Sequence, residues 1–393
     1  MMRTQIYGEE AGGFSAAGSA GGSPLAAERT ELVLRRLHRM IGPRFARAEP
    51  RDRAFAFLRG MALSAARRNG RRLADGAGEA RPDGMQRLLT TARWNADELR
   101  DDLRDVIVEH FGDPRAVLVL NGEGFAKKGD RSVGVQPQFS PSAGGTENCQ
   151  VAVFLTYAAP RAQAIIDREL YLPPEWAHDP ARRVRARVPA DVRFRSPGRL
   201  GWEMVRRAVE ARTPAAWVAA ETPFGHDVEL RRRLRERGIP HVLGLRADPR
   251  PLRSTGGRVL WGVPEEAIAS IPAHDWLRTT DRDDPVRRDS ACHSARILLK
   301  GADDGGLVQW LLIRRDTRKR RLYVCAAPPS TPLRELAEVA RQAELAPRCA
   351  ASARREVGLD HYEVRLWKAW YRYITLALLA HAGITLADGG APP

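Results

Sequence analysis

Residues 116–121 read AVLVLN, and this stretch decides the fold. Its apolar residues run without interruption and end at a polar one, which is typical of a strand buried within a sheet. Two further strands are predicted at QVAVFLTYA (150–158) and RAQAIIDRELYLP (161–173). The short link between these two strands predicts an antiparallel hairpin.

Helices and strands alternate after this hairpin. GRLGWEMVRRAVEAR (198–212) predicts a helix, and AAWVAAE (215–221) predicts a strand that ends in a carboxylate. A second helix over 229–238 ends at a glycine, and PHVLGLRAD (240–248) supplies a fifth strand. Three strands in a meander, followed by helix, strand, helix and strand, is the order of a ribonuclease H-like mixed sheet. The predicted fold class is therefore α/β, with a five-stranded mixed sheet of this kind.

The chain divides into six predicted regions. The all-α region before the core carries several short basic helices joined by tight turns, which resemble a helix-turn-helix DNA reader. A solvated, arginine-rich helical bundle has the same composition, and the sequence does not separate the two. The regions are a disordered tail (1–28), the helical and DNA-binding domain (29–112), the first part of the core (113–248), a β-rich insertion (249–330), C-terminal helices that complete the core (331–384) and a tail (385–393).

Two helices are expected near the C-terminus. The first covers residues 332–358 and is interrupted at Pro347, because proline removes a backbone donor and clashes with the preceding turn. The second covers residues 360–383 and has the apolar spacing of an amphipathic helix. Its aromatic side chains, among them Trp370, are expected in the core.

The charge balance points to a polyanionic partner. Lysine and arginine outnumber aspartate and glutamate by 64 to 48, which gives a formal net charge of +16. Each neutralised phosphate releases condensed counterions, so an excess of this size favours DNA. No run approaches the roughly 20 apolar residues that span a bilayer, and the N-terminus lacks the pattern of a secretory signal. We expect a cytoplasmic, nucleoid-associated protein that binds double-stranded DNA and no membrane, with homo-oligomerisation left open.

Six blocks of sequence carry a family resemblance. Their content and order resemble the insertion-sequence transposases of family seven-hundred-one, which belong to the DDE superfamily of endonucleases. This resemblance implies a ribonuclease H-like fold with a β-rich insertion, and action on DNA with Mg²⁺ or Mn²⁺. The blocks are AEPRDRAFAFLRG (48–60), PDGMQRLL (82–89), GFAKKGDRSVGVQPQFS (124–140), ENCQVAVFLTYA (147–158), DRELYLP (167–173) and GLDHYEVRLWKAWYRYITLALL (358–379).

The resemblance also implies three catalytic positions, at which the family places carboxylates that hold two divalent metal ions. The first is the Asp of an Asp-Glu-Thr-Gly-Phe run, and Asn121 stands there in this chain. The second is the Asp of an Ala-Asp-x-x-Tyr-Gly segment, where Glu221 is a weak metal ligand on a longer arm. The third is a Glu that falls on Pro347, which cannot bind a metal. The implied triad is degenerate, and metal binding is expected to be weak or absent.

Three functions follow as hypotheses. The first is a transposase-family protein that binds DNA but does not cleave it. The second retains metal-dependent strand transfer through a relocated carboxylate, for which Glu123, Asp227 and Glu363 are the possible substitutes. The third is a fold recruited as a non-nuclease enzyme or a partner-binding scaffold. The basic residues expected to contact DNA are Arg35, Arg36, Arg39, Arg67, Arg68, Arg71, Arg72, Lys127, Lys128 and Arg354, the last at the position of a family lysine.

Overall fold

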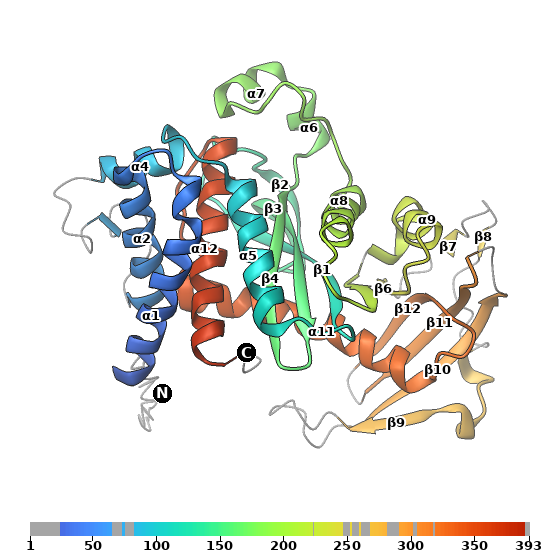
Figure 1. The fold of residues 1–393 in the computed structure, drawn as a ribbon. Coiled ribbons are helices and arrows are strands. Elements are labelled where there is room, and N and C mark those ends of the chain that lie inside the picture. Colours follow the sequence, from blue (N-terminus) through green and yellow to red (C-terminus); the bar gives the residue numbers. More distant parts are fainter. Residues whose placement is uncertain are drawn as a thin grey trace, which may run out of the picture.

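A mixed β-sheet forms the centre of the molecule (Figure 1). The structure is a computed structural model, and it describes residues 24–64, 73–74, 82–222, 224–246, 252–253, 259–260, 268–280, 291–301, 305–316 and 319–389. Its first strand, β1 (Val117–Ala126), lies between β3 (Gly145–Ala159) and β5 (Trp217–Ala220).

The sheet has the ribonuclease H-like order that the sequence predicts. β4 (Ala162–Leu170) pairs antiparallel with β3, and β3 pairs antiparallel with β1. β5 runs parallel to β1, and β6 (His241–Leu245) runs parallel to β5. The order β4-β3-β1-β5-β6 therefore confirms the predicted five-stranded mixed sheet. A short strand, β2 (Gln136–Ser140), pairs with the first part of β3.

The strands of the β-rich insertion continue the core sheet. β12 (Arg320–Ala327) pairs antiparallel with β6, and β11 (Val308–Arg315) pairs with β12. β10 (Ala291–Lys300) and β9 (Leu277–Thr280) follow in the same sheet. The antiparallel pairing of β12 with β6 places residues of the insertion beside the ends of the core strands. A separate pair is formed by β7 (Leu252–Arg253) and β8 (Val259–Leu260).

Helices cover both faces of the sheet. α11 (Leu333–Val357) packs on β1, β5 and β6 from one side. α8 (Pro197–Glu210) packs on β1, β3 and β4 from the other side, and α9 (Val228–Glu236) lies beside α8. Alternate side chains of the strands enter the two layers because successive side chains of a strand point to opposite faces. Val119 of β1 packs in a cluster with the first half of α11, whereas Leu120 packs in the cluster that contains α8 and the second half of α11.

The N-terminal helices surround the last helix rather than forming a detached module. α12 (Trp367–Ala387) contacts α1 (Pro24–Ile41), α2 (Ala48–Leu63), α4 (Asp83–Thr90) and α5 (Ala96–Phe111). α5 and α12 also contact β4, so the helical region and the sheet share one hydrophobic core (Figure 1). The short helical elements are η1 (Gly42–Arg44), α6 (Pro174–Ala177), α7 (Pro180–Ala186), η2 (Phe224–His226) and η3 (Ala273–Asp275).

Two expectations for the C-terminal helices are wrong. α11 continues through Pro347 without a break. A proline inside a helix costs about 3 kcal/mol, and the burial of an alanine-rich face on either side of it offsets that cost. That face includes Ala343, Ala346, Cys349 and Ala350.

The last helix begins later than expected and is not amphipathic. Gly358 adopts a φ of 64° and ends α11, after which residues 359–366 are irregular. Tyr362 in this segment is buried and donates a hydrogen bond to Gln150 at 3.0 Å, which fixes the segment in the core. α12 starts only at Trp367 and is buried around most of its circumference, because the N-terminal helices and the sheet enclose it.

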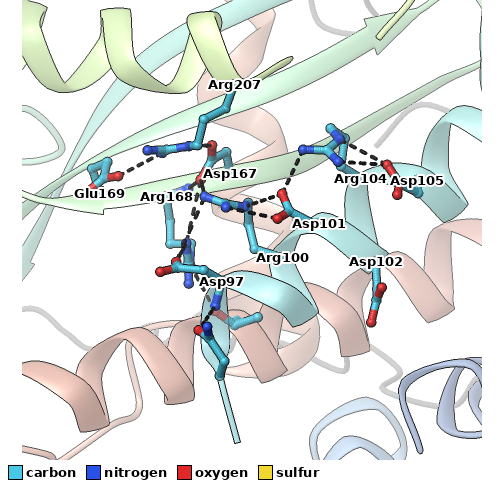
Figure 2. A network of polar contacts seen from close by, with 12 residues as sticks. Asp97, Arg100, Asp101, Asp102, Arg104, Asp105, Asp167, Arg168, Glu169 and Arg207 are labelled. Carbon is cyan, nitrogen blue, oxygen red and sulfur yellow. Dashed lines mark hydrogen bonds and ion pairs between the residues drawn. The ribbon is translucent and has the colours of Figure 1, made fainter. Parts of the chain in front are cut away.

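A buried network of ion pairs joins α5, β4 and α8 (Figure 2). Asp167 of β4 lies 3.3 Å from the guanidinium of Arg100 and 3.0 Å from that of Arg207. Arg168, also buried, pairs with Asp97 at 2.9 Å. A charge in the interior is tolerated only when opposite charges and hydrogen bonds compensate for its lost hydration. These arginines therefore hold the helical region against the sheet and are not available to a polyanion.

Candidate functional site

Asn121 and Glu221 lie side by side where β1 and β5 meet. Leu120 of β1 is in register with Ala220 of β5, so the next residue on each parallel strand is one of these two. The backbone amide of Glu221 donates to the carbonyl of Leu120 at 3.1 Å. Every second side chain of a strand points to the same face of the sheet. Asn121 therefore shares a face with Val119, and Glu221 shares it with Ala219; Val119 and Ala219 both pack in a cluster with residues of α11. The first two positions assigned from the sequence thus share one face, beneath α11.

Glu123 lies on the same face of β1 and is already engaged. Asn121 is fully buried, and its Nδ2 donates to Oε1 of Glu123 at 3.3 Å. Oε2 of Glu123 accepts hydrogen bonds from Ser142 at 2.7 Å and from the guanidinium of Arg354 at 2.6 Å. Within the described part of the chain, Oδ1 of Asn121 has no hydrogen-bond partner. The first position therefore presents a buried neutral amide beside a carboxylate that is paired with an arginine.

The carboxyl of Glu221 is held in its neutral form. Burial raises its pKa to about 8, and the neighbouring charge of Glu123 adds to this effect. Burial also raises the pKa of Glu123, against the opposing charge of Arg354. A protonated carboxyl is a poor ligand for a hard dication, because the ion requires negatively charged oxygen. At neutral pH, Glu221 is mostly protonated and contributes little negative charge.

Pro347 lines a cavity of about 640 Å³ together with Glu221. Glu344, one turn before Pro347 on α11, lines it as well. Its carboxylate accepts a hydrogen bond from Tyr323 at 2.8 Å and pairs with Arg314 at 2.9 Å. The acidic side chain one turn from the third position is therefore bound to an arginine and a tyrosine.

Basic side chains dominate the wall of this cavity. They come from the end of β6, from the start of β12 and from α11. Two carboxyl groups oppose them, those of Glu221 and Glu344. Such a charge balance repels cations and attracts anions, so these side chains do not suit a pair of divalent metal ions. The basic residues are Arg246, Lys319, Arg320, Arg321, Arg341 and Arg348.

The other possible substitutes lie away from this cavity's wall. Asp227 caps α9, with its Oδ1 accepting from the amide of Leu230 at 2.8 Å, and it also binds Ser196 at 3.2 Å. Glu363 is exposed in the segment between α11 and α12. Across the residues that the structure describes, no cluster of three or more His, Cys, Asp or Glu side chains is arranged to hold a metal ion.

The basic residues expected to contact DNA have different surroundings. Arg35, Arg36 and Arg39 are exposed on α1. Lys128 is exposed after β1, whereas Lys127 donates to the carbonyl of Tyr362 at 3.2 Å and lies over its ring. Arg354 binds Glu123, as described above. The remaining four, Arg67, Arg68, Arg71 and Arg72, lie outside the described residues.

The basic residues of the cavity were missed by the sequence analysis. A signal for them exists in the run RDTRKRRL (315–322), which is dense in basic residues and lies within the predicted β-rich insertion. The run alone does not show what it faces, because its position depends on the pairing of β12 with β6 across a long sequence separation.

Comparison with known protein families identifies the family of this chain. Residues 41–258, more than half of the chain, match the family model described as DDE superfamily endonuclease. The chain belongs to this family. The match covers Asn121 and Glu221 and ends before α11, where Pro347 lies. No curated protein matches the chain. DDE endonucleases act on DNA and typically use divalent metal ions.

One further finding concerns membranes. None of the helices that the structure describes is both long enough and apolar enough to cross a bilayer.

Proposed function

We propose that this member of the DDE endonuclease family is a DNA-binding protein of the transposase lineage, related to the insertion-sequence transposases of family seven-hundred-one, that does not cleave DNA. One observation carries the loss of cleavage. The cavity that contains Glu221 and Pro347 is lined by six basic side chains, and the nearby carboxylate of Glu123 is paired with Arg354. A two-metal reaction needs several ionised carboxylates converging on the metals.

The DNA-binding part of the proposal rests on charge and on α1. The net charge of +16 favours a polyanion, and the three exposed arginines of α1 lie on the outside of the helical region. Double-stranded DNA is the partner that this charge and the family together favour. Association with the nucleoid would follow from such binding.

Two alternative functions have less support. A relocated metal site would need free carboxylates, and Glu123 and Asp227 both have specific partners. A recruited small-molecule enzyme or scaffold would be favoured by a closed apolar pocket, whereas the cavity here is strongly basic. We therefore place both below the non-cleaving DNA binder.

DNA binding is tested by gel shift with duplex DNA over a series of salt concentrations. We expect the logarithm of the binding constant to fall linearly with the logarithm of salt concentration, with a slope of roughly 0.9 per phosphate contacted. The Arg35→Ala/Arg36→Ala/Arg39→Ala variant should bind more weakly and with a shallower slope. Arg115→Ala, on an exposed arginine paired with Asp113 before β1, is the matched control. Binding that is absent, or indifferent to salt, contradicts the proposal.

Cleavage is tested separately on DNA that carries terminal repeats of the kind that flank insertion sequences. We expect no nicking or joining with either Mg²⁺ or Mn²⁺. Metal-dependent nicking that is abolished by Glu221→Ala would favour a working relocated site instead.

A further inference from the structure

The cavity at the former catalytic positions has the charge and the walls of an anion site. It is bounded by the ends of β5 and β6, the start of β12 and one face of α11. Six basic side chains line it against two carboxyl groups. Glu344 is neutralised by its contact with Arg314. The wall of the cavity therefore carries more basic than acidic side chains, which favours an anion over a cation.

Two of these basic groups are oriented by carboxylates that do not line the cavity. Arg321 pairs with Asp316 at 2.9 Å, and Arg341 pairs with Glu338 at 2.6 Å. Each pairing orients one edge of a guanidinium, and an arginine fork carries five donors in a fixed planar arrangement. Groups that are already oriented lose less entropy on binding. The arrangement is thus built to receive an anion with several acceptor oxygens.

An aromatic ring lies at the same cavity. The side chain of Phe139 is 48% exposed, although it is a large apolar group, and it lines the cavity. The guanidinium of Arg246 lies over this ring, 5.3 Å from its centroid. An exposed ring beside arginines is a common platform on which a nucleobase stacks. The ring and the cations together favour a phosphate that is attached to a nucleoside.

We propose that this cavity binds the phosphate of a nucleotide unit directly through its arginines, without a divalent cation. The phosphate belongs either to a nucleic-acid strand or to a free nucleotide, and both present the same group to the same side chains. The strand as source rests on the proposed function, whereas the phosphate site itself does not. In this family member, arginines then take the place in which metal ions would neutralise phosphate.

The test is isothermal titration of the full chain in buffer that contains EDTA. Three probes are used: inorganic pyrophosphate, ATP and a 5′-phosphorylated single-stranded oligonucleotide. We expect pyrophosphate to bind and added Mg²⁺ to leave its affinity unchanged or weaker. Arg348→Ala and Arg320→Ala should each weaken pyrophosphate binding at least tenfold. No binding in EDTA, or binding that requires Mg²⁺, overturns the proposal.

Two controls keep the result specific. Arg115→Ala removes the same charge at the opposite end of β1 and should leave pyrophosphate binding unchanged. Arg348→Lys keeps the charge but loses the planar fork, so it should bind with intermediate affinity even if Arg348→Ala fails to fold. Equal weakening by Arg115→Ala would show a diffuse charge effect and contradict a built site.

The remaining measurements distinguish a nucleic-acid strand from a free nucleotide as the source of the phosphate, and they distinguish the phosphate site from the proposed DNA binding. An oligonucleotide that displaces pyrophosphate, with ATP weaker, assigns the phosphate to a strand, and the reverse order assigns it to a free nucleotide. Phe139→Ala should weaken ATP or oligonucleotide binding but not pyrophosphate binding. If the unaltered protein binds no pyrophosphate, and the Arg348→Ala variant still shifts DNA in a gel, the phosphate site is contradicted but the proposed function is not. Pyrophosphate binding without any gel shift would do the opposite.

Discussion

The guanidinium of Arg354 lies 2.6 Å from the carboxylate of Glu123 and joins α11 to β1. The same guanidinium donates to the carbonyl of Gly124 at 2.8 Å and to Ser142 at 3.1 Å. The carboxylate is buried, so its ionised form depends on this partner. The guanidinium of Arg354 therefore pairs with the carboxylate that accepts a hydrogen bond from Asn121.

Removing this arginine should destabilise the protein. In Arg354→Ala, Glu123 is left buried without its opposite charge, and we expect a loss on the order of 3 kcal/mol in the free energy of unfolding. Urea denaturation at pH 7 measures it. Adding Glu123→Gln to Arg354→Ala should recover part of the loss, because an amide needs no counter-charge. If the double variant is as unstable as the sum of the two single variants, the pair is not coupled.

Glu221→Gln should stabilise the protein in a pH-dependent way. The pKa of Glu221 is raised to about 8 by burial and by Glu123. The unfolded chain ionises this carboxyl above its ordinary pKa, whereas the folded protein keeps it protonated until near pH 8. Ionisation therefore favours the unfolded state as pH rises through this window, and glutamine escapes that cost.

Melting temperatures at pH 4 and pH 9 test this prediction. We expect the variant and the unaltered protein to melt closely together at pH 4, and the variant to melt higher at pH 9. Glu109→Gln, at an exposed site on α5, is the control and should show no such divergence. Equal melting temperatures of the variant and the unaltered protein at pH 9 would contradict the raised pKa of Glu221.

The order of elements was predictable because it depends on local patterns. The apolar run at 116–121 and the alternation that follows fix the sheet order, and with it the neighbourhood of Asn121 and Glu221. The apolar run predicts a strand that ends at Asn121, whereas β1 continues to Ala126. Asn121 and Glu221 are neighbours because β1 and β5 are parallel and Leu120 is in register with Ala220.

The chemistry of the cavity was not predictable in the same way. Arg320 and Arg348 meet there only because β12 joins β6 and α11 crosses the sheet, and both are contacts between segments far apart in sequence. Arg207 shows the converse. It lies in the helix predicted over 198–212, which holds several arginines, yet it is paired with the buried Asp167. Composition does not distinguish a buried pair from a free cation.

Asp167→Asn should be strongly destabilising at neutral pH. Burial alone would raise the pKa of Asp167, but Arg207, Arg100 and Arg168 outweigh burial and hold it below its ordinary value. The variant leaves these arginines without their shared charge, and we expect a loss of roughly 3–5 kcal/mol by urea denaturation. Because the folded pKa is lowered, the stabilisation is present above the ordinary pKa and is lost as pH falls through the folded one.

The loss caused by Asp167→Asn should therefore narrow under acid conditions. Asp105→Asn is the matched control, since this exposed aspartate pairs with Arg104 at 2.9 Å and should cost less than about 1 kcal/mol. A loss for Asp167→Asn as small as that of the control would show that the network contributes little to stability.

Placing carboxylates at Asn121 and Pro347, the first and third positions that the family resemblance assigns, should create metal binding. In Asn121→Asp/Pro347→Glu, two acidic side chains join Glu221 on the face that α11 covers, which returns the charge that a dication needs. We expect MnCl₂ to raise the melting temperature of this variant and to leave that of the unaltered protein unchanged, because a ligand that binds only the folded state stabilises it.

The comparison must be made within each variant, with and without metal. Replacing Pro347 removes a helix-interior proline and should raise stability by itself, by about 3 kcal/mol at most. In Asn121→Asp/Pro347→Gln, the removal of the proline stabilises α11 to the same extent, but the third carboxylate is absent. Its melting temperature should therefore not respond to Mn²⁺. A shift in the unaltered protein would mean that Glu123 or Glu344 can leave its arginine to bind a cation. A restored variant that ignores Mn²⁺ would mean that Pro347 is not the third position, and that α11 presents another residue to Glu221.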